Sequence, residues 1–211
     1  MNLADSLSSL LSAENRLTFG ELVLCLDAGG SYSARHRNDE GRAVSDLADL
    51  DSVRALREMA KYDEAGEYRP LKTAPGLKSG WHTATDSPRE FLQRLDAIYP
   101  GLFATWVAYD SGTFPPVPLR DTLGRQTGMY RFAGGITDGM AHRILAELCT
   151  PGCLRCITWP IDGTAPLPRV ARGAGTLPLL CTEACTFAVS RARELAKEAY
   201  DLANPPAPAQ G

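Results

Sequence analysis

Five of the six cysteines in this 211-residue chain lie close together in its last third. They form two short groups: Cys149, Cys153 and Cys156, followed by Cys181 and Cys185. Thiolates are soft ligands that suit zinc and iron-sulfur centres, and two local groups need only one long-range closure to make a four-ligand site. The spacing therefore predicts a metal centre.

The repeat of the spacing indicates which four cysteines are the ligands. Three residues separate Cys149 from Cys153, and three separate Cys181 from Cys185. Cys156 instead begins an apolar segment typical of a buried strand, so we keep it as an alternate ligand. Zinc stays open as the alternative metal, although structural zinc sites more often use cysteines separated by two residues. The 24 residues between Cys156 and Cys181 suit a [4Fe-4S] cluster, a [2Fe-2S] cluster and zinc alike.

Polar residues near the cysteines are candidates to surround the metal centre. Arg125, Gln126 and Thr127 form a polar stretch before the first cysteine, and Arg155 lies between Cys153 and Cys156. The arginines could offset the negative charge of a thiolate-ligated cluster, and the other two side chains could donate hydrogen bonds to it. A domain junction and a solvated arginine explain the same residues equally well.

The composition indicates a folded protein without a general affinity for nucleic acid. Hydrophobic residues make up 44% and charged residues 22% of the chain, with a formal net charge of -3 and a pI near 5.7. No apolar stretch approaches the roughly 20 residues that cross a bilayer. The N-terminus has no basic segment of a signal peptide, so we expect a cytoplasmic protein. Thiols stay reduced there, which favours metal ligation over disulfides for the clustered cysteines, whereas the isolated Cys25 is interpreted as a small buried hydrophobic residue.

The elements that must position the cysteines indicate an α+β fold. Residues 1–16 form a predicted amphipathic helix, and residues 17–118 a predicted stabilising domain. Within that domain we expect a hairpin of residues 17–27 and 32–37, helices over 47–62 and 88–98, and a strand over 102–109. Ser87, Pro88 and Glu90 have the pattern of a capping box with proline at the first helical position.

The second predicted domain, residues 119–203, is mostly helical and holds the cysteines. A helix capped by Thr137 or Asp138 runs to Leu148 and brings Cys149 to its end. We expect Thr182 to cap a last helix over residues 183–202, which would place Cys185 in its first turn, where free N–H groups stabilise a thiolate. Residues 204–211 are rich in proline and alanine, and we expect them to be disordered.

Several motifs together resemble the module appended to CbiX-type sirohydrochlorin chelatases. They cover most of residues 17–200, and they are residues 68–75, 80–81, 99–101, 125–130, 153–156 with Trp159, and 181–185. The resemblance implies a small stabilising domain followed by a [4Fe-4S] domain, and a cluster rather than zinc. It also implies that Cys149, Cys153, Cys181 and Cys185 are the ligands, and that the module accompanies metal insertion into sirohydrochlorin. Arg69, Lys72, Lys78 and His82, close to Trp81, could receive such a polycarboxylate, or could be ordinary solvated side chains.

The chelatase domain of that family is not recognisable in this sequence. Its metal-binding histidines have no counterpart, because His36, His82 and His142 are scattered. We therefore expect a [4Fe-4S] protein with an electron-transfer or redox-regulatory role, accessory to sirohydrochlorin, cobalamin or sirohaem metabolism, rather than a stand-alone chelatase. A protein partner, a chelatase or a redox enzyme, follows from this role. The alternative is a non-redox interaction module whose structural cluster or zinc ion supports docking to a partner enzyme. An enzyme using the cluster as a Lewis acid would need an open iron, and five candidate cysteines argue against one.

Overall fold

The chain divides into two compact units, which are described separately. The computed structural model describes residues 2–114, 117–126, 128–129, 132–149, 153–157 and 175–203. Unit 1 comprises residues 1–114, 154–156 and 170–180, and unit 2 comprises residues 115–153, 157–169 and 181–211. The predicted tail, residues 204–211, and Thr127 lie outside the described residues. Helices and a mixed sheet confirm the predicted α+β class.

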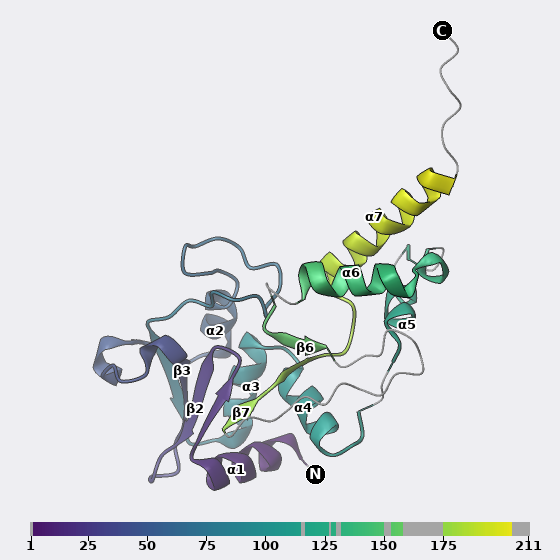
Figure 1. Ribbon diagram of the computed structural model, residues 1–211. Helices are drawn as coiled ribbons and strands as arrows, with labels where there is room; N and C mark the ends of the chain where they lie inside the picture. Colours follow the sequence, from purple (N-terminus) through teal and green to yellow (C-terminus); the bar gives the residue numbers. More distant parts are fainter. Residues whose placement is uncertain are drawn as a thin grey trace. The chain divides into compact units, whose positions relative to one another are not determined.

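Unit 1 is built on a six-stranded sheet (Figure 1). The strand order is β4-β5-β3-β2-β1-β7. The strands are β1 (Arg16–Phe19), β2 (Leu22–Leu26), β3 (Tyr32–His36), β4 (Ala48–Asp49), β5 (Trp81–Thr85) and β7 (Thr176–Leu177). The pairs β1–β2, β2–β3 and β3–β5 are antiparallel, whereas β1–β7 and β4–β5 are parallel. A separate pair joins β6 (Arg155–Ile157) to β8 (Leu179–Cys181).

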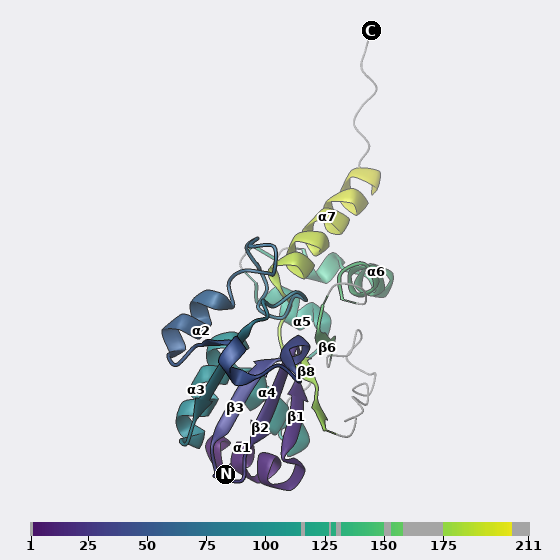
Figure 2. The same ribbon diagram turned by 90° about the vertical axis from the view of Figure 1, so that its left-hand side faces the viewer.

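Four α-helices accompany the sheet in unit 1. They are α1 (Leu3–Glu14), α2 (Val53–Met59), α3 (Pro88–Ile98) and α4 (Leu102–Asp110). Single 3-10 turns lie at residues 37–39 and 44–46. Helices α1 and α3 pack directly on the strands, and α4 packs on both of these helices (Figure 2).

The core of unit 1 lies on one face of the sheet. In the strand register Leu17 pairs with Leu24, and Leu24 pairs with Ala34, so their side chains share a face. That face packs against Leu7 and Phe91 of α1 and α3. Cys25 has the opposite orientation in β2 and is only half-buried, so the predicted full burial of this cysteine is wrong.

Helix α3 forms as its sequence predicts. The Ser87 hydroxyl accepts a hydrogen bond from the Glu90 N–H, and Pro88 occupies the first helical position. The buried residues Phe91, Leu95 and Ile98 repeat at intervals of three and four residues. This repeat directs one stripe of the helix to the core.

Three predicted elements of unit 1 are wrong in type or extent. Residues 102–109 form helix α4 rather than a strand, because Gly101 adopts a left-handed conformation and Leu102, Phe103 and Trp106 bury one helical face. The expected strand over 17–27 is a hairpin of β1 and β2, with a turn at Gly20. The expected helix over 47–62 shortens to α2 because its first residues form β4.

Unit 2 is mostly helical in its described residues. It contains α5 (Leu119–Gly124), a 3-10 turn (Ala133–Gly135), α6 (Asp138–Leu148) and α7 (Thr186–Ala203). Thr137 caps α6, as predicted, because its hydroxyl accepts a hydrogen bond from the Met140 N–H. The helix α7 begins at Thr186, so the expected start after Thr182 is wrong.

Candidate metal centre

Four of the five clustered cysteines belong to unit 2 and lie at the ends of its elements. Cys149 is the residue that ends α6, and its N–H donates to the Leu145 carbonyl at 2.9 Å. Cys153 belongs to the irregular segment that leads into β6. Cys181 is the last residue of β8, and Cys185 immediately precedes α7. Cys156 lies on β6 and is assigned to unit 1, and its side chain is outside the described part of the structure.

The other three thiols affect the ionisation of Cys149. The pKa of Cys149 is raised to about 11, first by burial and in addition by the charges of the neighbouring thiols of Cys153, Cys185 and Cys181. Both sequence groups thus affect the electrostatics at Cys149, although 24 residues separate them in the sequence.

Two of the sulfur atoms take part in the local main-chain structure. The Cys185 sulfur accepts a hydrogen bond from the Ala188 N–H at 3.5 Å, in the position of a helix cap. The Cys181 thiol donates to the Glu183 carbonyl at 3.1 Å. Cys185 thus lies at the positive end of the α7 dipole, which favours a thiolate. The predicted location at a helix N-terminus is correct in kind, although the residue precedes the helix instead of lying within it.

Helices α6 and α7 are held together next to the cysteines that they carry. The Arg191 guanidinium forms a forked pair with Glu147, with Nε–Oε2 at 2.6 Å and Nη2–Oε1 at 3.3 Å. This hydrogen bonding lowers the pKa of Glu147 below its usual value. The two helices also belong to one buried cluster, which includes Ile144, Ala188 and Ala192. The small side chains of Ala188 and Ala192 allow α7 to approach α6 closely.

Of the polar residues predicted around the site, Arg125 has a contact within a ligand segment. Its Nη2 lies 2.8 Å from Oε1 of Glu183, a residue between Cys181 and Cys185. Gln126 has a main-chain role, since its N–H donates to the Leu123 carbonyl and its carbonyl accepts from the Met129 N–H. Arg155 lies on β6 and is assigned to unit 1.

Sequence reasoning missed the acidic residues Glu147 and Glu183. Each could have been found from its position, because Glu147 lies two residues before Cys149 and Glu183 lies inside the second cysteine pair. Each carboxylate holds an arginine from another element of unit 2.

The chemistry of the donor set fits an iron-sulfur cluster. Unit 2 contains four of the clustered cysteines, and a four-iron cluster takes one thiolate on each of its irons. Among the residues that the structure describes, no group of three or more histidine, cysteine, aspartate or glutamate side chains is placed to hold a single metal ion. This finding applies to zinc and to a cluster alike.

The basic residues near Trp81 do not gather as one surface. Arg69 is buried and binds main-chain carbonyl groups, and Lys72 is half-buried with a pKa lowered first by burial. Lys78 lines a cavity of about 540 Å³ in unit 1 together with Met59 and Trp81. His82 lies 3.8 Å from Asp49.

Two family profiles match this chain, one over its N-terminal part and one over the part that contains the clustered cysteines. The family profile of the DR2241 stabilising domain matches residues 5–110, half of the chain. This chain belongs to the DR2241 stabilising-domain family. The profile of a 4Fe-4S iron-sulfur cluster binding domain matches residues 111–194, which include all five clustered cysteines. The association with CbiX-type chelatases that the sequence motifs imply is not shown by these matches.

A solved structure of this family covers most of the chain. The crystal structure of DR2241 from Deinococcus radiodurans superposes with a TM-score of 0.72 at 29% identity over 93% of this chain. It is described as a multi-domain protein with structural similarity to chelatases and two additional novel domains. The present chain spans 42% of that protein. No curated protein has significant similarity to the chain.

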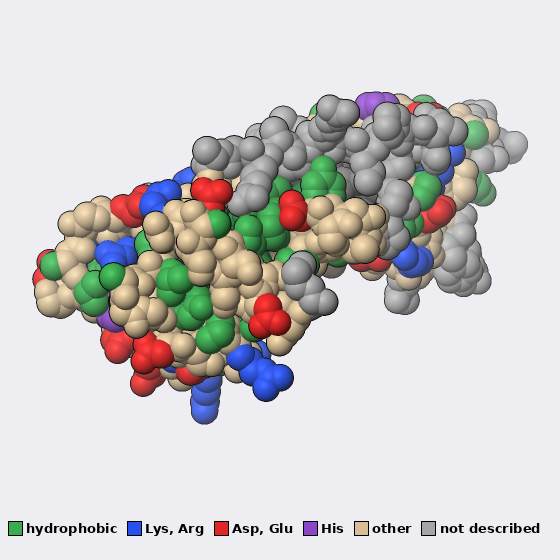
Figure 3. Space-filling model, turned by 90° about the horizontal axis from the view of Figure 1, so that it is seen from below, with side chains coloured by type: hydrophobic (Ala, Val, Ile, Leu, Met, Phe, Trp, Pro, Cys, Tyr) green, Lys and Arg blue, Asp and Glu red, His purple; other side chains and the backbone are tan. Residues whose placement is uncertain are grey.

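The surface of the described residues carries charges of both signs, as the small net charge of the chain leads one to expect. On the face seen in Figure 3, acidic and basic side chains of the described residues are interspersed. None of the helices that the structure describes is long and apolar enough to span a bilayer.

Proposed function

We propose that this chain binds a [4Fe-4S] cluster through Cys149, Cys153, Cys181 and Cys185, and that it serves electron transfer or redox regulation. One observation supports the ligand assignment: all four cysteines belong to unit 2, with Cys149 at the end of α6, Cys181 at the end of β8 and Cys185 immediately before α7. The family match over residues 111–194 supports the cluster as the group bound there.

The main chain around the site supports thiolate ligation. Cys185 occupies the start of α7, where its sulfur already accepts an N–H, and such donors stabilise the negative charge of a ligated cluster. Cys149 is half-buried and the charges of the other three thiols raise its pKa, so a bound cation would relieve the repulsion between its thiolate and theirs. When bound, a [4Fe-4S] cluster supplies one-electron chemistry at a potential that hydrogen bonds and exposure tune.

The proposed role is accessory to another enzyme. The similarity of the DR2241 protein to chelatases supports a place beside metal insertion into tetrapyrroles such as sirohydrochlorin. A chelatase or a redox enzyme is the partner class that fits such a role. A redox-inert centre would favour the alternative, an interaction module with a structural metal site.

The test begins with the protein purified without oxygen. Four irons and four sulfides per chain, with a visible absorption band that dithionite bleaches, are expected of a redox-active [4Fe-4S] protein. One zinc per chain, or iron without acid-labile sulfide, would contradict the proposal. A full complement of iron that dithionite leaves unchanged would retain the cluster and remove the redox role.

Single serine substitutions then test the four ligands. Cys149→Ser, Cys153→Ser, Cys181→Ser and Cys185→Ser should each lose most of the bound iron, because metal binding and local folding are coupled. Cys25→Ser is the matched control, since Cys25 is a half-buried thiol on β2 of unit 1 and should leave the iron content unchanged. Loss of iron in Cys156→Ser together with retention in Cys149→Ser would show that the alternate cysteine is the ligand.

A further inference from the structure

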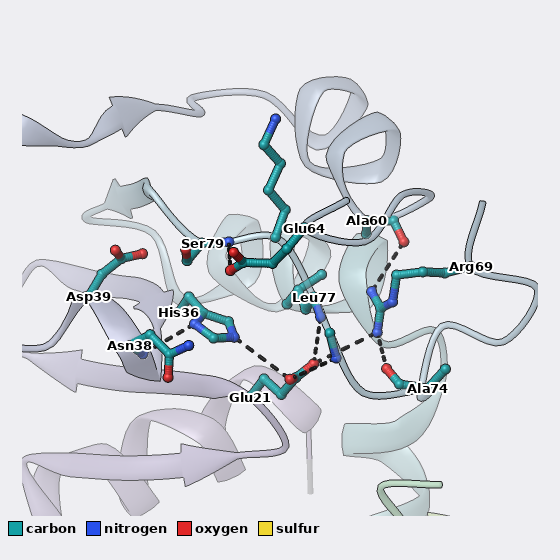
Figure 4. A network of polar contacts seen from close by, with 12 residues as sticks. Glu21, His36, Asn38, Asp39, Ala60, Glu64, Arg69, Ala74, Leu77 and Ser79 are labelled. Atoms are coloured by element: carbon teal, nitrogen blue, oxygen red, sulfur yellow. Dashed lines mark hydrogen bonds and ion pairs between the residues drawn. The ribbon is translucent and has the colours of Figure 1, made fainter. Parts of the chain in front are cut away.

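A buried carboxylate on the sheet of unit 1 holds a loop that has no regular secondary structure. Glu21 lies between β1 and β2 and is only 4% exposed. Its Oε1 accepts from the Gly76 N–H at 3.0 Å and its Oε2 from the Leu77 N–H at 2.8 Å (Figure 4). Two cationic or polar groups flank it, with His36 Nε2 and Arg69 Nη2 each 3.8 Å away. Burying a carboxylate costs free energy because the group loses its hydration, and partners such as these compensate for that loss.

Arg69 binds the same loop from within. It is 3% exposed, and its guanidinium donates to the carbonyl groups of Ala60, Lys72 and Ala74. Figure 4 shows Arg69 between Ala60 and Ala74, with Glu21 beside it. The carboxylate thus fixes the N–H groups at one end of the segment 69–77, and the guanidinium fixes carbonyl groups in its middle.

The residue between those carbonyl groups contacts the chain next to a cysteine. Thr73 is buried, and its carbonyl accepts from the Leu154 N–H at 3.1 Å. Leu154 packs against the core of unit 1 and directly follows Cys153. The lysine and alanine on either side of Thr73 are the two whose carbonyl groups bind Arg69. Arg69 therefore holds the carbonyl groups on both sides of the one that accepts from Leu154, and Glu21 holds the N–H groups three and four residues after it.

We propose that Glu21 and Arg69 are positioning residues for Cys153, acting through the loop 69–77 and its hydrogen bond from Thr73 to Leu154. The expected effect on a bound cluster rests on the proposed function. The effect of Glu21 and Arg69 on the Leu154 main chain does not require a bound cluster. A second ligand segment has a comparable arrangement, because Leu179 and Leu180 lie in the core of unit 1 immediately before Cys181. The stabilising domain thereby fixes one neighbour of each of two ligands.

The chain offers a matched control for the loss of a buried arginine. Arg94 is 5% exposed and, like Arg69, donates to three oxygen atoms, which belong to Thr83, Ala84 and Glu90. None of these three lies in the loop 69–77. Arg69→Gln and Arg94→Gln should therefore destabilise unit 1 in similar ways, while only the first releases the loop.

The first measurement is hydrogen exchange at the Leu154 amide in the full-length, metal-free chain. Loss of one hydrogen-bond constraint should speed that exchange about fivefold or more in Arg69→Gln and in Glu21→Gln, and leave it within about twofold in Arg94→Gln. The second measurement is the rate of iron release to a chelator from the loaded protein, which should rise in the same two variants and not in the control.

The outcomes separate this proposal from the proposed function. Unchanged Leu154 exchange in a folded Arg69→Gln protein, or equal acceleration in Arg94→Gln, would overturn it. If Arg69→Gln does not fold, Glu21→Gln decides by the same criteria. If the wild-type chain binds no iron, the cluster assignment fails, whereas the coupling of Arg69 to Leu154 is still decided by hydrogen exchange.

Discussion

Glu21→Gln should be among the most destabilising single-atom changes in unit 1. Glutamine keeps the size of the side chain but has one accepting oxygen in place of two, so its amide group would face one of the two N–H donors of Gly76 and Leu77. A hydrogen bond to a charged group contributes about 1.5–3 kcal/mol, and an unsatisfied buried donor costs about 1–3 kcal/mol. We expect the free energy of unfolding to fall by about 2–4 kcal/mol, which lowers the melting temperature by roughly 5–12 °C for a chain of this size.

The effect should depend on pH in a defined direction. Burial by itself raises the pKa of Glu21, but the contact with His36 and the two main-chain N–H groups outweigh it, and the net pKa lies below its usual value of 4.5. A carboxyl whose pKa is lower in the folded state stabilises that state fully above the unfolded pKa, and less as pH falls through the folded pKa. The difference between wild type and Glu21→Gln should therefore stay constant from pH 7 to about 5.5 and shrink below about 4.5.

Thermal unfolding followed by tryptophan fluorescence measures this difference, since Trp81 and Trp106 are both buried in the core of unit 1. Glu58→Gln is the control, because Glu58 forms an exposed pair with Lys61 and its loss should not change the melting temperature measurably. A loss of less than about 1 kcal/mol, or a difference that persists unchanged to pH 3.5, would refute the reasoning about the buried carboxylate.

Two further predictions concern the neighbours of Glu21. Gly20→Ala should lower the free energy of unfolding, measured by denaturant titration, by about 3 kcal/mol, because a Cβ there would lie 2.8 Å from both Leu179 Cδ1 and Tyr99 Oη at a φ of +63°. Gly30→Ala is the control, because Gly30 has a φ of +86° with nothing within 4 Å of an added Cβ, and it should lower the same free energy by only about 1 kcal/mol. Equal losses in the two variants would contradict the effect of crowding at Gly20. Tyr99→Phe should cost about 1–3 kcal/mol because it leaves the Glu21 N–H buried without its acceptor. Burial raises the pKa of Tyr99 to about 12, so the absorbance of the wild-type protein at high pH should show a tyrosine that ionises near pH 12 and that this variant lacks. The stabilisation of the folded state by Tyr99 should decline as pH rises from 10 toward 12.

Local sequence signals predicted the helices whose ends carry explicit caps. Ser87 and Pro88 mark the start of α3, and Thr137 marks the start of α6. Such signals depend on residues within one turn of each other, so the sequence alone is sufficient. The same logic placed Cys149 at the end of α6.

Elements decided by tertiary contacts were not predictable in this way. The aromatic and branched residues of α4 favour a strand by propensity, but burial of Leu102, Phe103 and Trp106 on one side makes the segment helical. The start of α7 was missed because the cap is the sulfur of Cys185, a residue type that is not expected at a helix cap. Glu21 and Arg69 are 48 residues apart and carry no local signal of their joint burial.

The two units differ in how far their own cores can stabilise them. Among the described residues, the unit 1 core contains large side chains such as Trp81, Phe91 and Trp106, whereas alanine supplies five of the thirteen buried residues of the unit 2 core. Burial contributes about 25 cal/mol per Å² of apolar surface, so a small core of alanines stabilises little by itself. In unit 2 two cysteines already serve the core or the main chain, because Cys181 is buried and Cys185 caps α7. Ligation of these sulfurs would then add to the folding free energy of unit 2 directly. Leu180, which precedes Cys181, lies in the core of unit 1, and Leu154, which follows Cys153, packs against that core. Under the proposed ligand assignment the main chain at these two positions is ordered before metal binds, which lowers the conformational entropy that ligation must remove.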